Sequence, residues 1–328
     1  MKYRTLGVNP QTRREVSVLS LGAMLFGTAT DEATSYAILD RYVEAGGTFI
    51  DTANNYAYWV NGTQGGESES LLGRWRRANG VGEEVVIATK LAGRPLEPSN
   101  TLTTNVEGLS AAVIRESSAR SRERLGVSRL DLLYAHIHDR RVPMEETVEA
   151  FGALVTEGSV GLLGASNHWS WRVERCRQLA ASAGLSGYEV LQYHHTYLRQ
   201  RTDMGNRHSP DGELGVAGGD VLDYVRHNPS LTLVAYTPLL SGAYVRDDKP
   251  LGPEHDHAGT PVRLKALHEV AAETGATPNQ VVLSWLIGGD IPVIPLVGAS
   301  SVAQLDESLA AVDLELTADQ RACLDAAQ

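Results

Sequence analysis

The segment VVIATK, residues 85–90, indicates the fold most clearly. Its β-branched and small apolar residues run without polar alternation until they reach Lys90. This pattern is typical of a strand that is buried on both faces, as strands are in a parallel sheet covered by helices. A half-exposed antiparallel strand would instead alternate apolar and polar residues.

Seven further runs of this kind occur along the chain, and a helix-like stretch follows each of them. They span residues 17–21, 48–51, 130–136, 160–165, 190–193, 231–236 and 291–295. Repeated strand and helix units predict an α/β fold with a parallel sheet. Because no linker or low-complexity stretch divides the eight units, the sequence predicts one (β/α)₈ TIM barrel domain over residues 1–328.

Turn and capping signals support the predicted helices. Gly46 and Gly47 end a helix over residues 31–45, and Thr277-Pro278-Asn279-Gln280 combines a capping box with proline at the first helical position. Residues 317–320 repeat the box before a last short helix. Long loops are expected over residues 196–215 and 238–260, at the C-terminal face where a barrel places its active site.

Composition excludes several classes of protein. The formal net charge is −11, which argues against a nucleic-acid binder, and no apolar run is long enough to span a membrane. The first ten residues lack a signal-peptide core, and the chain has 2 cysteines, too few for a disulfide framework. We expect a cytoplasmic protein with a small-molecule partner; an oligomer is compatible with the sequence, which carries no signal for one.

Polar or reactive residues stand at the ends of most predicted strands, where a barrel would bring them to one rim. They are Asp51, Lys90, His136, Ser166 with Asn167, Gln192 and Tyr236. Tyr56 follows Asp51 by five positions, in the loop that leaves the second predicted strand. A series of such residues on one rim indicates an enzyme.

The residue types suggest acid chemistry on a carbonyl group. A nearby ammonium, supplied by Lys90, makes a phenol such as Tyr56 a stronger acid. Asp51 would orient Lys90, and His136 would hydrogen-bond the substrate oxygen as negative charge develops there. No metal is expected, because His194-His195 and His255-Asp256-His257 lack a third ligand at a recognisable spacing.

The ordered motifs resemble the aldo-keto reductases, in particular their bacterial and potassium-channel β-subunit-like branches. The motifs are LGAMLFG, FIDTANNYA, ESLLG, VVIATK, SRERLGV, SRLDLLYAHIHD, LLGASNHW, LQYHH, VAYTPLLSGAY and VGASSVAQLDESL. The resemblance implies a carbonyl reductase that uses NADPH, with NADH the less favoured cofactor. It also implies that Asp51, Tyr56, Lys90 and His136 form the catalytic tetrad.

The resemblance further implies a cofactor extended across the barrel mouth. Ser166, Asn167 and Gln192 would bind the nicotinamide carboxamide, and Tyr236 would stack on the ring. The remaining cofactor residues implied are Gly22, Met24, Asp51, Pro238, Leu239, Ser241, Gly242, Gly298, Ser300, Ser301, Gln304, Glu307 and Ser308. No G-x-G-x-x-G motif occurs, which disfavours a Rossmann dehydrogenase.

Two positions depart from the family pattern. Many relatives have lysine at position 243 and arginine at position 304, where this chain has Ala243 and Gln304. Arg246 or Lys249 would have to supply charge for the cofactor phosphates, and Ser300 and Ser301 would bond a 2′-phosphate. The predicted substrate pocket contains Met24, Tyr58, Trp59 and Trp169, side chains that suit a bulky or planar carbonyl.

Two alternative functions remain open at this point. The barrel would act as a sensor or regulatory subunit if it bound NADP(H) with little turnover. It would act as an aldolase or isomerase if Lys90 formed a Schiff base.

Overall fold

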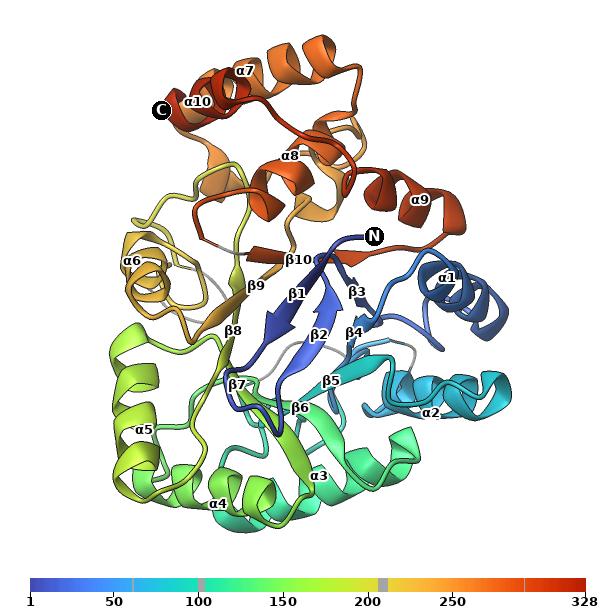
Figure 1. Cartoon of the computed structure of the whole chain (residues 1–328), viewed down its shortest axis with the longest axis vertical. Helices are drawn as coiled ribbons and strands as arrows, with labels where there is room; N and C mark the ends of the chain where they lie inside the picture. The colour runs from blue at the N-terminus through green and yellow to red at the C-terminus, as the bar shows by residue number, and fades with distance from the viewer. Residues whose placement is uncertain (61, 100–103, 206–211, 292) are drawn as a thin grey trace.

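The fold is a closed barrel of eight parallel strands, which confirms the predicted (β/α)₈ architecture (Figure 1). The computed structural model describes residues 1–60, 62–99, 104–205, 212–291 and 293–328. The barrel strands are β3 (Ser20–Gly22), β4 (Phe49–Asp51), β5 (Val86–Leu91), β6 (Leu130–Ala135), β7 (Val160–Ser166), β8 (Val190–His194), β9 (Thr232–Tyr236) and β10 (Val293–Gly298). They follow one another around the barrel in chain order, and β10 closes it by pairing with β3.

Helices surround the barrel as an outer ring (Figure 1). They are α1 (Glu32–Glu44), α2 (Glu67–Asn79), α3 (Ala111–Leu125), α4 (Met144–Thr156), α5 (Ser170–Ser182), α6 (Gly219–His227), α7 (Gly259–Thr274), α8 (Pro278–Ile287), α9 (Val302–Ala310) and α10 (Ala318–Ala326). Both predicted capping boxes are present, at Thr277 and Thr317. Among the helices described, none is long and apolar enough to cross a bilayer.

An antiparallel hairpin precedes the barrel and was not predicted. It consists of β1 (Tyr3–Leu6) and β2 (Arg14–Ser17) and lies across one end of the barrel (Figure 1). Leu6 and Val16 are fully buried and pack with the apolar side chains inside the barrel. The predicted strand over residues 17–21 is therefore divided, because Ser17 ends the hairpin and the barrel strand begins at Ser20.

The last barrel strand also differs from its predicted range. It runs on to Gly298 instead of ending at Pro295, because Leu296 and Val297 pair with β3 to close the barrel. Pro292, inside the predicted range, lies outside the described residues.

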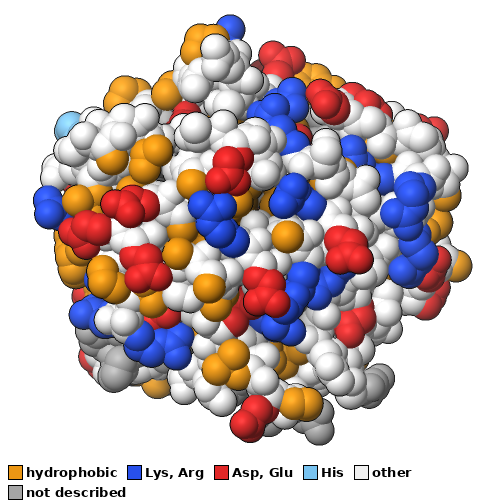
Figure 2. Space-filling model, turned by 90° about the horizontal axis from the view of Figure 1, so that it is seen from below, with side chains coloured by type: hydrophobic (Ala, Val, Ile, Leu, Met, Phe, Trp, Pro, Cys, Tyr) orange, Lys and Arg blue, Asp and Glu red, His pale blue; other side chains and the backbone are white. Residues whose placement is uncertain are grey.

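The two predicted loops follow β8 and β9. Residues 206–211 of the first lie outside the described part of the chain. The second contains two short 3₁₀ turns, Leu240–Gly242 and Pro253–His255, before α7 begins. On the face shown in Figure 2, basic, acidic and hydrophobic side chains are interspersed, so charge of a single sign does not gather there.

Candidate active site

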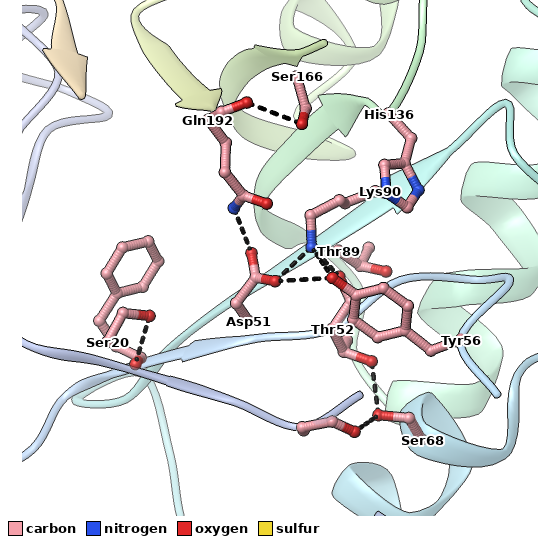
Figure 3. Close-up of polar contacts among 12 residues, drawn as sticks. Ser20, Asp51, Thr52, Tyr56, Ser68, Thr89, Lys90, His136, Ser166 and Gln192 are labelled. Atoms are coloured by element: carbon pink, nitrogen blue, oxygen red, sulfur yellow. Dashed lines mark hydrogen bonds and ion pairs between the residues drawn. The ribbon is translucent and has the colours of Figure 1, made fainter. Parts of the chain in front are cut away.

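Asp51, Lys90 and Tyr56 form one hydrogen-bonded group at the C-terminal end of the barrel (Figure 3). Asp51 ends β4, Lys90 stands near the end of β5, and Tyr56 lies in the turn after β4. The Lys90 ammonium donates to Asp51 Oδ1, to the Thr52 carbonyl oxygen at 2.9 Å and to Tyr56 Oη at 2.7 Å. The Tyr56 hydroxyl faces Asp51 Oδ1 at 3.3 Å.

Burial and hydrogen bonding act on Lys90 in opposite directions. Its side chain has no exposed surface, and this burial lowers the pKa of Lys90, while the Asp51 carboxylate raises it. The charged form has three N–H donors, which match the three acceptors around Nζ. We therefore describe Lys90 as an ammonium whose donors are all engaged within the protein.

Tyr56 and His136 lie between this buried group and a cavity. Both side chains are half-buried and line it, whereas Asp51 and Lys90 lie beneath. The two rings meet edge to face with centroids 6.0 Å apart. A carbonyl oxygen placed between them would meet two possible donors.

The cavity has a volume of about 1030 Å³ and extends from Tyr56 and His136 to the start of α9. It brings together most of the cofactor residues expected from the sequence: Gly22, Met24, Ser166, Asn167, Gln192, Tyr236, Pro238, Leu239, Ser241, Gly242, Gly298, Ser300, Gln304, Glu307 and Ser308. Met24, Tyr58 and Trp59 of the expected substrate pocket line it as well.

Four expected site residues do not line this cavity, and one of them is Lys90, which is fully buried. Asp51 is fully buried under Tyr56. Ser301 is the N-cap of α9, and its hydroxyl accepts from the Gln304 backbone N–H. Trp169 is the N-cap residue of α5 and is absent from the cavity lining, which contains Tyr58 and Trp59.

A continuous set of hydrogen bonds joins the strand ends next to the tetrad. The Asn167 amide donates to the His136 carbonyl oxygen at 3.0 Å and accepts from the Tyr236 hydroxyl at 2.8 Å. Ser166 donates to the Gln192 carbonyl oxygen at 2.8 Å. The Gln192 side chain reaches across the barrel and donates to Asp51 Oδ2 at 2.8 Å (Figure 3). Gln192 therefore contacts the tetrad directly, a connection that the sequence analysis did not contain.

The turn after β9 has a strained backbone beside the cavity. Thr237, Leu240 and Ser241 have positive φ angles of 53°, 48° and 56°. Such conformations cost free energy in residues other than glycine and are concentrated at functional sites. Arg246 lines the same part of the cavity and makes a bidentate ion pair with Asp248. Lys249 also lines it and makes no ion pair with any described residue.

The far end of the cavity is polar. Gln304 Oε1 accepts from the backbone N–H and hydroxyl of Ser300, which leaves the Gln304 amide N–H groups for other partners. Glu307 Oε1 accepts from Thr277 at 2.8 Å. Asn279 Oδ1 is buried and has no hydrogen-bond partner in the described part of the chain.

Several cavity residues were missed in the sequence analysis. Asn55, Leu25, Leu214 and Asn279 line the cavity. Asn279 lies within the capping box of α8, so its presence in the sequence was explained by helix capping and did not indicate that it also lines the cavity. Asn55 donates to the Gly93 carbonyl oxygen at 2.9 Å and is adjacent to Tyr56 in the sequence, which is the one signal that pointed to it.

The two histidine clusters were considered as possible metal ligands. Among the described residues, no group of three or more His, Cys, Asp or Glu side chains is arranged to hold a metal ion. His255 and His257 instead both contact the Arg199 carbonyl oxygen, at 3.1 and 3.0 Å.

The fold and the site define a class of protein that sequence comparison identifies. The profile of the aldo/keto reductase family matches residues 18–328, and the chain belongs to this family. It is thus an NAD(P)H-dependent oxidoreductase of the type that reduces carbonyl compounds.

Individual relatives are similar over nearly the full chain. "Uncharacterized oxidoreductase YrpG" of Bacillus subtilis (strain 168) is 30% identical, with 96% of this chain and 92% of the relative covered. "Norsolorinic acid reductase B" of Aspergillus parasiticus is 31% identical, with 97% and 82% covered. "Aldo-keto reductase ausK" of Emericella nidulans is 28% identical, with 97% and 79% covered.

Proposed function

We propose that this chain reduces an aldehyde or ketone to an alcohol with NADPH, and that Tyr56 is the general acid. The observation that carries the proposal is the buried group of Asp51 and Lys90, which is hydrogen-bonded to the hydroxyl of Tyr56, a residue that lines the cavity. Bound NADPH would supply the hydride for the carbonyl carbon. The residues of this chain would supply the proton and the orientation.

The geometry supports a defined proton path. Lys90 donates to Tyr56 Oη, so the phenol oxygen carries a positive neighbour when its proton leaves. The bond from Tyr56 to Asp51 is long at 3.3 Å, so the hydroxyl can turn toward a substrate oxygen at little cost. Tyr56 would then give its proton to that oxygen and later regain one from solvent. His136 would stabilise the negative charge on the oxygen during hydride transfer.

Several features of the cavity support a nicotinamide dinucleotide as the cofactor. The amides of Asn167 and Gln192 offer donors and acceptors near Tyr56, as a carboxamide requires. At the opposite end, the unpartnered Asn279 Oδ1 suits a donor such as an adenine amino group. Arg246 and Lys249 are the cationic side chains of the described cavity lining and would face the phosphates.

The same geometry disfavours a Schiff-base enzyme. Lys90 has no exposed surface, and its donors are engaged with Asp51, Thr52 and Tyr56. A substrate carbonyl in the cavity would meet Tyr56 and His136 before it could reach Lys90. For substrate class, Tyr58 and Trp59 beside the tetrad and the relatives named norsolorinic acid reductases favour a bulky or planar ketone.

A carbonyl panel tests the proposed function. We expect NADPH oxidation with one or more members of a set of aromatic aldehydes, ketones and quinones, because the cavity combines a proton donor with apolar walls. The measurement is cofactor absorbance, with enzyme lacking substrate as the control. Cofactor binding without turnover across the panel would favour a sensor, and substrate trapped on Lys90 by borohydride would favour an aldolase.

The chain is also expected to bind NADPH more tightly than NADH, by roughly tenfold to a hundredfold. The preference is modest because Gln304 and Ser300 offer neutral hydrogen bonds, and because Asp248 already pairs with Arg246. Titration of both cofactors by quenching of intrinsic fluorescence measures it.

A variant that adds a positive charge at position 304 provides a second measurement of the cofactor preference. Gln304→Arg should widen the preference and make NADPH binding more sensitive to salt. Gln178→Arg adds the same charge on an exposed position of α5 and is the matched control. Equal dissociation constants for the two cofactors in the parent protein would contradict 2′-phosphate recognition at this end of the cavity.

A further inference from the structure

Tyr134 places a phenol inside the barrel directly below the site. It lies on β6, its side chain is fully buried, and it packs with the apolar residues that fill the barrel interior. Its hydroxyl has no hydrogen-bond partner of ordinary geometry among the described residues, although the Gln192 side chain lies near enough to act on it. A buried donor without a partner costs free energy, so its presence in an otherwise apolar layer calls for an explanation.

The surroundings of Tyr134 connect it to the tetrad. In the sheet register it is the partner of Lys90, whose Nζ lies 5.8 Å from the centroid of the Tyr134 ring. Asp51, Tyr134 and Gln192 come from β4, β6 and β8, which are alternate strands. Inward-facing side chains of alternate strands share one layer of a (β/α)₈ barrel. Tyr134 therefore faces the same interior layer as the bonded pair of Gln192 and Asp51, and both of these groups act on its hydroxyl.

The barrel has space for this ring because its neighbour is a glycine. Gly164 is the register partner of Tyr134 on β7, and a Cβ at that position would lie 2.4 Å from the Tyr134 ring. No side chain larger than hydrogen is compatible with this packing. The ring is thereby held in one place, with its hydroxyl among the polar groups of Asp51 and Gln192.

The hydroxyl remains a donor throughout the working range of pH. Burial, followed by the negative charge of Asp51, raises the pKa of Tyr134 well above its ordinary value, while the Gln192 side chain lowers it. Tyr134 thus keeps its proton and can donate it in a hydrogen bond, but it cannot serve as the acid itself.

We propose that Tyr134 is a positioning residue, whose hydroxyl supports the Asp51–Gln192 pair from inside the barrel while Tyr56 gives up its proton. This inference rests on the proposed function, because it takes Tyr56 as the acid. When Tyr56 loses its proton it stops donating to Asp51 and becomes negative beside it. An additional donor to the Asp51–Gln192 pair reduces the repulsion between the two oxygens.

Tyr134→Phe tests the inference because it removes only the hydroxyl. We expect an unchanged or higher Tm, an unchanged cofactor Kd and a kcat lower by about tenfold, since the hydroxyl would donate to the Asp51–Gln192 pair only when charge develops on Tyr56. The alkaline limb of kcat/KM should move to higher pH by roughly half a unit to one unit, because an unsupported Asp51 carboxylate favours the protonated phenol.

The matched control is Tyr42→Phe. Tyr42 is also fully buried, but its hydroxyl lies within hydrogen-bond distance of two acceptors, the carbonyl oxygens of Leu19 at 2.7 Å and Phe49 at 2.9 Å. This variant should lose stability and keep the parent kcat and pH profile. A Tyr134→Phe enzyme with the parent kcat and pH profile would overturn the proposal, whatever its Tm.

A double-mutant comparison identifies the route of the effect. If Tyr134 acts through Asp51, then Tyr134→Phe should add nothing to Asp51→Asn in single-turnover reduction. A further tenfold loss in the Asp51→Asn background would overturn the proposed route. Tyr56→Phe, measured in parallel, separates the two hypotheses: normal activity of that variant would refute Tyr56 as the acid, whereas an effect of Tyr56→Phe alone would refute only the role of Tyr134.

Discussion

Tyr56→Phe is expected to lower kcat for carbonyl reduction by about 10² to 10⁴, the range in which general acid catalysis contributes. The phenyl ring can keep its place and its edge-to-face contact with His136. The substitution removes the hydroxyl proton of Tyr56, which we expect to be transferred to the substrate, from its place beside Lys90 and Asp51. Cofactor Kd should change little, because most of the cavity lining is unaltered.

Steady-state kinetics and fluorescence titration of the same preparation check this expectation. Tyr58→Phe is the control, since it removes a hydroxyl from a neighbouring aromatic residue that also lines the cavity. It should keep a far larger share of the activity. If Tyr56→Phe reduces substrate within a fewfold of the parent rate, another group must be the acid.

Lys90→Met is expected to be at least as damaging to turnover and to reduce stability as well. It removes the cation beside Tyr56 Oη and leaves the Asp51 carboxylate fully buried without a positive partner, although Gln192 and Tyr56 still donate to it. Removing one partner of a buried ion pair commonly costs about 3 to 5 kcal/mol, because the other charge is left uncompensated. The kinetic loss must therefore be measured beside a thermal melting curve.

Lys265→Met is the matched control for this substitution. Lys265 is exposed on α7 and makes a surface ion pair with Glu269 at 3.7 Å. Such pairs contribute little, so both Tm and kcat should stay near the parent values. A folded Lys90→Met enzyme with normal kcat would refute the proposed pairing of Lys90 with Tyr56.

The outer part of the site could be predicted from sequence because barrel topology gives strand ends a common location. A charged residue at the end of an apolar strand, such as Lys90, is seldom needed for folding alone. In a barrel, several residues at strand ends must also meet at one rim. The same logic brought Ser166, Asn167 and Gln192 near the tetrad. It could not show that Gln192 bonds Asp51, because that contact depends on the rotamer of a side chain that spans the barrel.

Other features gave weaker signals. Tyr134 lies within LDLLYA, where an aromatic residue is what any apolar core requires, so nothing in the pattern marks its hydroxyl. The hairpin strands β1 and β2 have four residues each, too short for their periodicity to be distinguished from a loop. Trp169 follows the strand-end motif closely enough to be placed on the rim, but the helix that begins at Ser170 takes it out of the cavity lining.

The N-terminal hairpin and the cavity occupy opposite ends of the barrel (Figure 1). The hairpin ends at Ser17, immediately before the residues that match the family profile. Leu6 and Val16 close one end of the barrel with apolar side chains, while the loops at the opposite end line the cavity. Substitutions at the closed end should therefore act on folding, and substitutions around the cavity should act on which molecules the protein converts. The two properties can be altered independently, because different residues carry them.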